Sequence, residues 1–245
     1  MNSKRFTCSV GKWLTGGISL AAASYVAYVA VAWFRYGKTR RANCDDADAL
    51  LDMFMPSYEV GGRHKIRVAA PPEVTLSAAT ETELESRGLI RAIFKGREWI
   101  LQSKPDHTVR PQGFLAQTKS LGWGVLAERP AREIVMGCAT KPWEPNPVFR
   151  TLQPDEFAAF QEPGYVKIAW TLRADPTEHG ESIFRTETRA IATSSDARRK
   201  FRRYWSFLSP GIILIRTVML PAVKREAERR WRSAAAWHPY STGMM

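Results

Sequence analysis

Alternation of apolar and polar residues predicts an antiparallel sheet in the second half of the chain. In the segment 165–174 every second residue is large and apolar, which is typical of a half-buried strand. These apolar residues are Val166, Ile168, Trp170 and Leu172. The segments 122–129 and 132–140 flank a turn at Pro130-Ala131 and predict a hairpin. A further strand is predicted over 182–192.

The first strand of the sheet is predicted over His64–Val68 and is followed by two prolines. Pro71 and Pro72 end the strand, but proline is tolerated in the first turn of a helix, so a short helix is predicted over 74–82. A second helix is predicted over 89–101 and a loop over 105–118. Five prolines within 141–164 predict an irregular segment, because proline cannot donate to a strand ladder.

A long amphipathic helix is predicted from the sequence TSSD at 193–196, which fits a capping box with Asp196 in the third helical position. Its apolar residues recur at spacings of three and four and face a side that is almost entirely arginine. Proline at 210 and at 221 predicts kinks in this helix. The apolar residues are Phe201, Tyr204, Trp205, Leu208, Ile212, Ile215, Met219 and Val223.

An uncharged segment of 21 residues, 14–34, predicts an N-terminal transmembrane helix. Trp13 and Trp33 stand at its two ends, where aromatic rings favour the membrane interface. A buried core helix is one alternative, and a signal peptide cleaved after Ala30-Val31-Ala32 is another. An uncleaved anchor is favoured because four bases follow the segment. This slight excess over the three preceding bases predicts a cytoplasmic globular domain.

The net charge of +12 does not indicate a nucleic-acid-binding protein, because the bases are concentrated at the two ends of the chain. Residues 1–41 hold seven bases and no acid, and residues 196–232 hold eleven bases and three acids. The three cysteines are far apart, and no metal-ligand spacing or glycine-rich phosphate motif occurs. We therefore expect no metal and no cofactor.

These patterns divide the chain into four parts. Residues 1–41 form the predicted membrane anchor with basic flanks, and residues 42–62 form a connector. Residues 63–232 form the globular domain, and residues 233–245 form a tail. Strands in series with helices before and after them predict an α+β fold.

The stretch HKIRVAAPPEVTLSAA (64–79) resembles the first strand and helix of the START-like (SRPBCC) superfamily. That group contains polyketide cyclases, lipid-transfer proteins and plant pollen-allergen relatives. The segments GWGVLAERPAREIVMG (122–137) and RRKFRRYWSFLSPGIILIR (198–216) are also similar to bacterial members. The resemblance spans roughly residues 60–230 and implies a helix-grip fold, in which a curved antiparallel sheet surrounds the long C-terminal helix.

The resemblance also implies a hydrophobic cavity between the sheet and the terminal helix. Candidate ligand-binding residues are Val166, Ile168, Trp170, Leu172, Phe184, Thr186, Thr188, Tyr204, Trp205 and Leu208. Each of them has an alternative role as ordinary core. Glu187 is a weak candidate for a general base if its face of the strand borders the cavity. The alternative is a solvent-facing strand whose Arg185, Glu187 and Arg189 form ion pairs.

The expected function is therefore a membrane-anchored START-like domain that binds a hydrophobic small molecule or a lipid, without catalysis. Two alternatives remain open. One is a cyclase- or hydrolase-like enzyme of the same fold, with Glu187 as general base. The other is an envelope interaction module whose basic terminal helix, with Arg198, Arg199, Arg202 and Arg203, docks a partner. Those arginines could also contact acidic lipid headgroups or form a solvated face.

Overall fold

A five-stranded antiparallel sheet, in the order β3-β7-β6-β5-β4, forms the centre of the computed structural model, which describes residues 19–20, 22–41, 48–82 and 113–237. Its strands are β3 (Val60–Val68), β4 (Gly124–Arg129), β5 (Glu133–Thr140), β6 (Val166–Pro176) and β7 (Ser182–Ala192). A second, two-stranded sheet pairs β1 (Arg40–Arg41) with β2 (Ser57–Tyr58). The helices are α2 (Ala49–Phe54), α3 (Pro72–Glu81), α5 (Phe114–Ser120), α6 (Pro154–Ala159) and α7 (Ser195–Trp237). Residues 22–35 are also helical.

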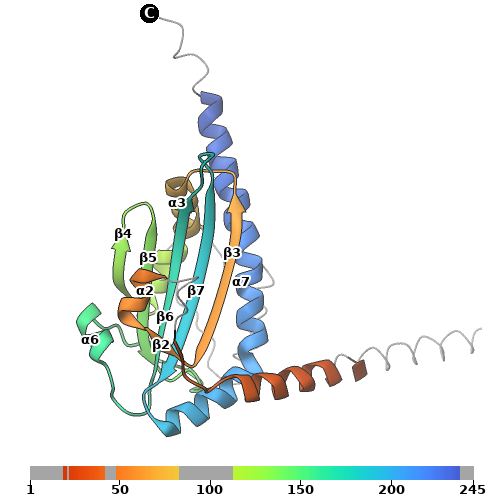
Figure 1. The fold of residues 1–245 in the computed structure, drawn as a ribbon, viewed down its shortest axis with the longest axis vertical. Helices are drawn as coiled ribbons and strands as arrows, with labels where there is room; N and C mark the ends of the chain where they lie inside the picture. Colours follow the sequence, from red (N-terminus) through yellow and green to blue (C-terminus); the bar gives the residue numbers. More distant parts are fainter. Residues whose placement is uncertain (1–18, 21, 42–47, 83–112, 238–245) are drawn as a thin grey trace, which may run out of the picture.

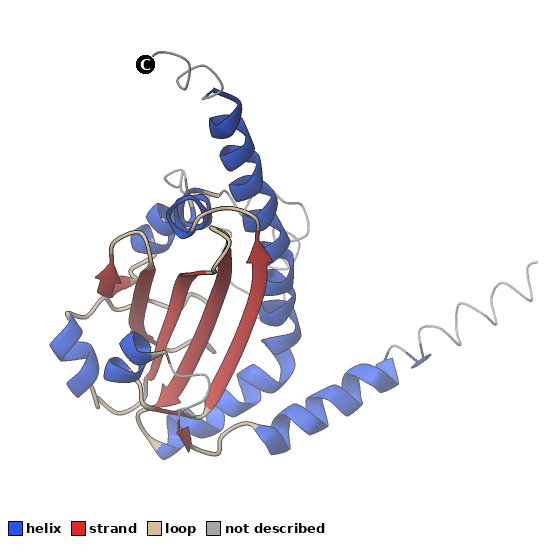
Figure 2. Ribbon diagram, turned by 45° about the horizontal axis from the view of Figure 1, so that its top comes forward, coloured by secondary structure: helices blue, strands red, loops and turns tan. Residues whose placement is uncertain are grey.

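Helices cover both faces of the five-stranded sheet (Figures 1 and 2). We call the face toward α3 and α7 the inner face; Trp170 and Phe184 pack from it against Val223 of α7. We call the opposite face the outer face; Val135 and Ala169 lie there, against side chains of α2 and α6. The fold is thus an α+β sandwich of sheet and helices, with a long C-terminal helix along the inner face.

The strand predictions are confirmed in pairing and nearly in extent. The predicted hairpin is present as β4 and β5, joined by a turn in which Ala131 has a φ of 58°. The last predicted strand coincides with β7. In the central pairing Trp170 lies opposite both Met136 and Thr188. Alternation was reliable here because these strands are buried on the apolar side and have one consistent period.

Other predicted boundaries were wrong. Helix α5 occupies part of the predicted loop 105–118, and it begins after Gly113, whose φ is 86°. The described part of the predicted connector 42–62 holds α2 and the first residues of β3. Helix α3 begins at Pro72, two residues before the predicted start. The helix predicted over 89–101 lies outside the described residues.

Helix α7 is continuous through Pro210 and Pro221 and extends to Trp237, inside the predicted tail. Ser194 caps it, because the Ser194 hydroxyl accepts a hydrogen bond of 3.2 Å from the Ala197 N–H. Figure 1 shows that α7 first runs below the sheet, then bends and continues alongside β3. Pro210 and Pro221, where kinks were predicted, both lie inside this helix.

Within the described residues, the helix long and apolar enough to cross a membrane is α7, over Ser195–Ala234, rather than a helix at the N-terminus. The sequence prediction placed this property at 14–34, of which residues 14–18 and 21 are not described. The most apolar window of α7 has a mean hydropathy of 1.6 because its bases cluster at 198–203 and 224–232. Since α7 packs on the sheet, the same composition also fits a core helix.

Candidate ligand-binding site between the sheet and the terminal helix

Two packed clusters connect α7 to the inner face of the sheet, one in the second half of the helix and one near its N-terminal end. Met219 and Val223 pack against Trp170 and Phe184 in the first cluster. Phe201 packs against the opposite ends of the strands in the second cluster. All five side chains are at most 6% exposed. At these two places α7 is held on the sheet as in an ordinary protein core, whereas residues 231–234 are exposed.

Between these clusters the packing of α7 on the sheet is incomplete. Ile168 is the third residue of β6, the central strand, and lies on the inner face beside the second cluster, yet it is only partly buried. Ile66 on β3 is also partly buried. The α7 residues that are only partly buried here are Leu208, Ile212, Ile215 and Arg216. Apolar side chains from two elements thus share an incompletely covered region in the centre of the inner face.

Arg216 reaches from α7 to the inner face of β7 in this region. Its Nη1 donates a hydrogen bond of 3.1 Å to the Thr186 hydroxyl, and its Nη2 donates to the Thr188 hydroxyl. Both threonines are buried, at 1% and 8% exposure. Burial lowers the pKa of Arg216 to about 10, so the guanidinium stays charged at neutral pH. No carboxylate in the described part of the chain pairs with Arg216.

His64 of β3 lies opposite Thr186 in the strand register, on the same strand face as Ile66. Burial lowers its pKa, and the positive charge of Arg216 lowers it further. His64 is therefore neutral at pH 7, since its ordinary pKa of 6.5 is already below that pH. The polar groups in the centre of the inner face are thus two hydroxyls, an imidazole and one cation.

The indole N–H of Trp205 is a further donor on α7. It is buried and has no hydrogen-bond partner among the described residues. The spacing of Trp205, Ile212 and Arg216 by seven and four residues places all three on one side of the helix. A buried donor without an acceptor is unfavourable by about 1–3 kcal/mol, and a bound molecule with an acceptor atom would remove that penalty.

The ten residues predicted to bind ligand lie on the inner face or on α7, but they do not have the same surroundings. Ile168 and Leu208 are partly exposed, and Thr186 and Thr188 are the partners of Arg216. Four of the others are buried in the packed clusters: Val166, Trp170, Leu172 and Phe184. Tyr204 and Trp205 are partly buried against the second cluster, as Ile168 is. The first four residues therefore outline the candidate site.

Glu187 points to the outer face, because its neighbours Thr186 and Thr188 point to the inner one. Its carboxylate accepts hydrogen bonds from Arg63 Nε at 2.8 Å and from Arg189 Nε at 2.7 Å. Arg189 also contacts Asp52 of α2 at 2.5 Å and the Met55 carbonyl at 2.8 Å. Glu187 is consequently a member of a buried ion-pair network and is separated from the inner-face region by the sheet.

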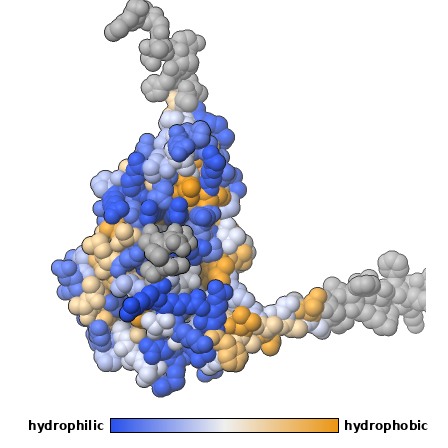
Figure 3. All heavy atoms as spheres, viewed as in Figure 1, coloured by the Kyte–Doolittle hydropathy of each residue, from blue (hydrophilic) through white to orange (hydrophobic). Residues whose placement is uncertain are grey.

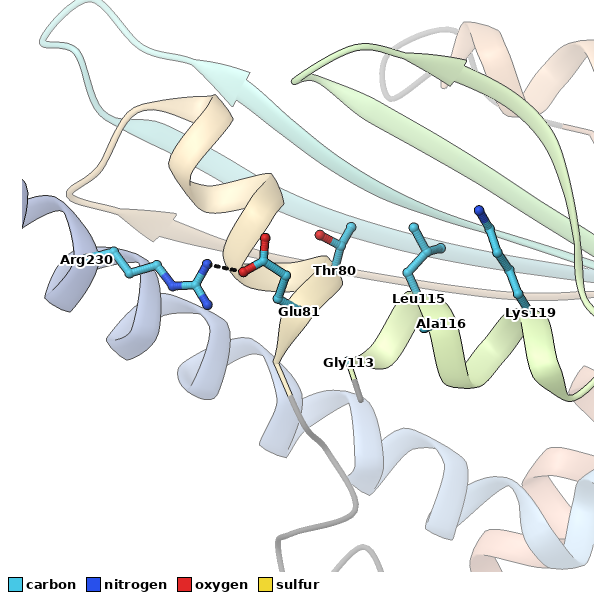
Figure 4. Close-up of a pocket in the computed structure, with 7 residues that line it drawn as sticks. All are labelled: Thr80, Glu81, Gly113, Leu115, Ala116, Lys119 and Arg230. Carbon is cyan, nitrogen blue, oxygen red and sulfur yellow. Dashed lines mark hydrogen bonds and ion pairs between the residues drawn. The ribbon is translucent and has the colours of Figure 1, made fainter. Parts of the chain in front are cut away.

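An open hollow of about 560 Å³ lies elsewhere, between α3, α5 and the end of α7 (Figure 4). Arg230 of α7 reaches Glu81 at the end of α3, with 2.6 Å between Nη1 and Oε2. None of the ten predicted ligand residues lines this hollow. Glu81 and Gly113 in its lining border the segment 83–112, which is not described, so we build the candidate site from the contacts in the middle of α7.

Arg216 and His64 were missed by the sequence prediction, although each had a signal. Arg216 follows Ile212 by four residues and precedes Met219 by three, so it interrupts the apolar stripe of α7. His64 has the same strand parity as Ile66 and Val68. A charged residue in an apolar stripe indicates a buried charge, which is uncommon unless the charge is paired or functional.

Comparison with known proteins finds solved structures that are similar to this chain but no match in sequence. No protein-family model matches the chain, and no curated protein matches it in sequence. Protein MLL2253 from Mesorhizobium loti aligns with 69% of this chain and 98% of its own, at 16% identity and a TM-score of 0.31. CalU16 from Micromonospora echinospora aligns with 81% of this chain and 99% of its own, at 14% identity and a TM-score of 0.26.

The Zhui aromatase/cyclase from Streptomyces sp. R1128 aligns with 71% of this chain and 97% of its own, at 15% identity and a TM-score of 0.24. At these scores the likeness assigns neither a family nor an activity. The function therefore has to be argued from the contacts of the chain itself.

Proposed function

We propose that this chain is a membrane-anchored START-like domain that binds a hydrophobic small molecule or a lipid between the inner face of the sheet and α7. The observation that carries this proposal is the incomplete packing in the middle of the inner face. Ile66 and Ile168, each packed beside one of the two buried clusters, and Ile212 of α7 are only partly buried there. Mostly apolar surroundings with a few polar groups are typical of small-molecule sites.

The membrane part of the proposal is supported by the N-terminal helix. Several large apolar side chains of residues 19–35 are exposed, and Figure 3 shows apolar surface where this helix meets the rest of the molecule. Leu20, Val26 and Phe34 are 70%, 66% and 72% exposed. Contiguous exposed apolar surface of this kind marks membrane or protein contacts. With the bases that follow it, we infer an anchor over residues 1–41 and a globular domain on the cytoplasmic side.

The anchor helix is also attached to α7. The Tyr25 hydroxyl donates a hydrogen bond of 2.7 Å to the Phe207 carbonyl, and the hydroxyls of Tyr28 and Ser209 are 2.9 Å apart. The guanidinium of Arg202 lies over the Trp33 ring, 4.6 Å from its centroid. These contacts support a role for α7 close to the membrane and favour lipid as the class of ligand.

Native mass spectrometry of the full chain, released from lipid nanodiscs, tests ligand binding. We expect a non-covalent adduct of a lipid-sized molecule on the wild-type chain. Ile212→Trp should fill the incompletely packed region and remove the adduct. Leu214→Trp is the matched control, because Leu214 is 41% exposed on α7 and should leave the adduct unchanged. A wild-type chain without any adduct, after incubation with excess lipid, would contradict the proposed function.

Carbonate extraction of membranes that contain the full chain tests the anchor. We expect the protein to remain in the membrane pellet and to keep residues 1–32, as its intact mass will show. Val26→Arg should shift it toward the soluble fraction, since a central arginine disfavours insertion by about 2.5–3.5 kcal/mol. A chain that has lost its first 32 residues would instead identify the segment as a signal peptide.

The two alternative functions have less support from the contacts. Glu187, the candidate general base of an enzyme, lies on the outer face in ion pairs with Arg63 and Arg189. For an interaction module, Arg198 and Arg202 of the basic helix already have partners inside the chain, Glu59 and the Trp33 carbonyl. Neither arrangement favours these alternatives over ligand binding.

A further inference from the structure

We propose that Arg216 binds an oxyanion headgroup of the apolar ligand, so that the chain selects amphiphiles with a carboxylate or a phosphate over neutral molecules of the same length. This inference rests on the proposed function and specifies the class of ligand. It is carried by the position of a cation in the incompletely packed region between the sheet and α7.

The charge of Arg216 has no counter-charge in the described structure. Its two partners, Thr186 and Thr188, are neutral hydroxyls, which satisfy two of the five N–H donors of a guanidinium. Burying an ion without an opposite charge is strongly unfavourable. By comparison, buried Arg189 on the opposite face of the same strand contacts two carboxylates. An anionic ligand would supply Arg216 with the partner that Arg189 already has.

The two threonines also orient the guanidinium. Because Thr186 and Thr188 are two residues apart on one strand, their hydroxyls hold Nη1 and Nη2 at the same time. A planar guanidinium fixed in this way keeps three further N–H donors in defined positions, and guanidinium donors match carboxylate and phosphate oxygens. Preorganisation of this kind lowers the entropy lost on binding.

The residues around Arg216 are mostly apolar and match the apolar chain of an amphiphile. Ile212 and Ile215 adjoin it on α7, and Ile66 and Ile168 lie across from this helix on the inner face. His64 adds no negative charge there, since an imidazole is neutral or positive. An apolar chain would therefore contact isoleucines while its headgroup contacts the guanidinium.

A purely structural role for Arg216 predicts a different result. In that case the guanidinium only ties α7 to β7, and the chain would bind neutral and anionic amphiphiles equally well. Headgroup preference, rather than binding as such, is the measurement that separates the two roles.

The experiment is a competition in nanodiscs that contain the full chain and equal amounts of oleic acid and methyl oleate. Native mass spectrometry then gives the ratio of the two adducts. We expect the wild-type chain to prefer the acid by about 10-fold or more, the factor for hydrogen bonds to a charged group. A second pair, oleoyl lysophosphatidic acid and monoolein, distinguishes a phosphate from a carboxylate ligand; a preference for the anion in either pair supports the proposal.

Arg216→Met should abolish the preference and retain the methyl oleate adduct. Arg225→Met is the matched control, because Arg225 is an exposed arginine on the same helix, and it should keep the wild-type preference. Equal binding of both members of each pair by the wild-type chain would overturn this inference and leave the proposed function standing. A chain that binds none of the four would overturn both.

Discussion

Each face of strand β7 contacts an arginine, and the two arginines have different kinds of partner. On the outer face, Arg189 is fully buried and lies between the carboxylates of Glu187 and Asp52. On the inner face, Arg216 of α7 meets only the hydroxyls of Thr186 and Thr188. The first arrangement supplies carboxylates for the charge, although Nη2 of Arg189 has no hydrogen-bond partner among the described residues, whereas the second has no counter-charge in the described part of the chain. The comparison teaches that a buried arginine can hold a fold together or remain available for a partner, depending on what faces it.

The largest change in the free energy of unfolding is expected for a substitution on the outer face, at Arg189. Arg189→Met leaves Glu187 and Asp52 without their buried partner and should lower the free energy of unfolding by about 3–5 kcal/mol. Urea denaturation of the full chain in detergent measures this change. Arg132→Met, at an exposed position after the β4–β5 turn, is the control and should change stability by less than about 0.5 kcal/mol. A loss below about 1 kcal/mol for Arg189→Met would show that the network is not structural.

Glu133, a second carboxylate on the outer face, makes the stability of the chain depend on pH. Burial raises the pKa of Glu133 from 4.5 to about 8, with a further rise from the hydrogen bond to Asp48 and from its charge. The folded chain therefore binds this proton more tightly than the unfolded chain, so the contribution of Glu133 to stability is greatest below pH 4.5 and is lost as the pH rises toward 8. Neighbouring Arg129 and Arg173 oppose the shift.

Glu133→Gln removes this titration and keeps a neutral group that can donate to Asp48. The stability of the variant relative to the wild type should therefore rise by on the order of 2 kcal/mol between pH 5 and pH 8. Urea denaturation at the two pH values measures the difference. Glu162→Gln, at an exposed ion pair with Arg150, should show no such pH dependence relative to the wild type. Parallel curves for Glu133→Gln and the wild type would contradict the raised pKa.

The smallest change in the free energy of unfolding is expected for a substitution on the inner-face side, at Arg216. Arg216→Met removes two hydrogen bonds but also removes an uncompensated buried charge, and these effects have opposite signs. We expect the free energy of unfolding, measured without added ligand, to change by no more than about 1 kcal/mol. A loss as large as that for Arg189→Met would show that both arginines are structural, and the contrast between the two faces would disappear.

The sheet was predictable because its strands have one dominant period. In β7, Phe184, Thr186 and Thr188 alternate with Arg185, Glu187 and Arg189, and the predicted and observed bounds agree. Three short helices escaped prediction for physical reasons, and one of them, α6, lies in the segment 141–164 that was predicted to be irregular. Helix α2 has six residues and α5 has seven, too short to display a helical period, and α5 has no side-chain cap.

Because helix α2 was not predicted, the burial of the outer face was not predicted either. One of the two interpretations of Arg189 was a solvent-facing position, because the apolar and threonine side of its strand is easier to bury, yet Arg189 is fully buried and contacts Asp52 of α2. On the inner face, the arginines of α7 were interpreted together as one polar side. Arg216 differs from them by its place in the apolar stripe, and only the contact with β7 shows which partners it has. Contacts between residues far apart in the chain cannot be predicted from the local pattern of apolar and polar residues.

Arg216 stands between the two prolines of α7, Pro210 and Pro221. Each proline lacks an N–H, so the carbonyls of Ser206 and Thr217, one turn earlier, lose their usual donor. The backbone hydrogen bonds of α7 are therefore interrupted on either side of this arginine, while Phe201 and Val223 beyond the two prolines are packed on the sheet. Amide protons of residues 211–215, which are only partly buried or exposed, should exchange with deuterium sooner than those near Val223.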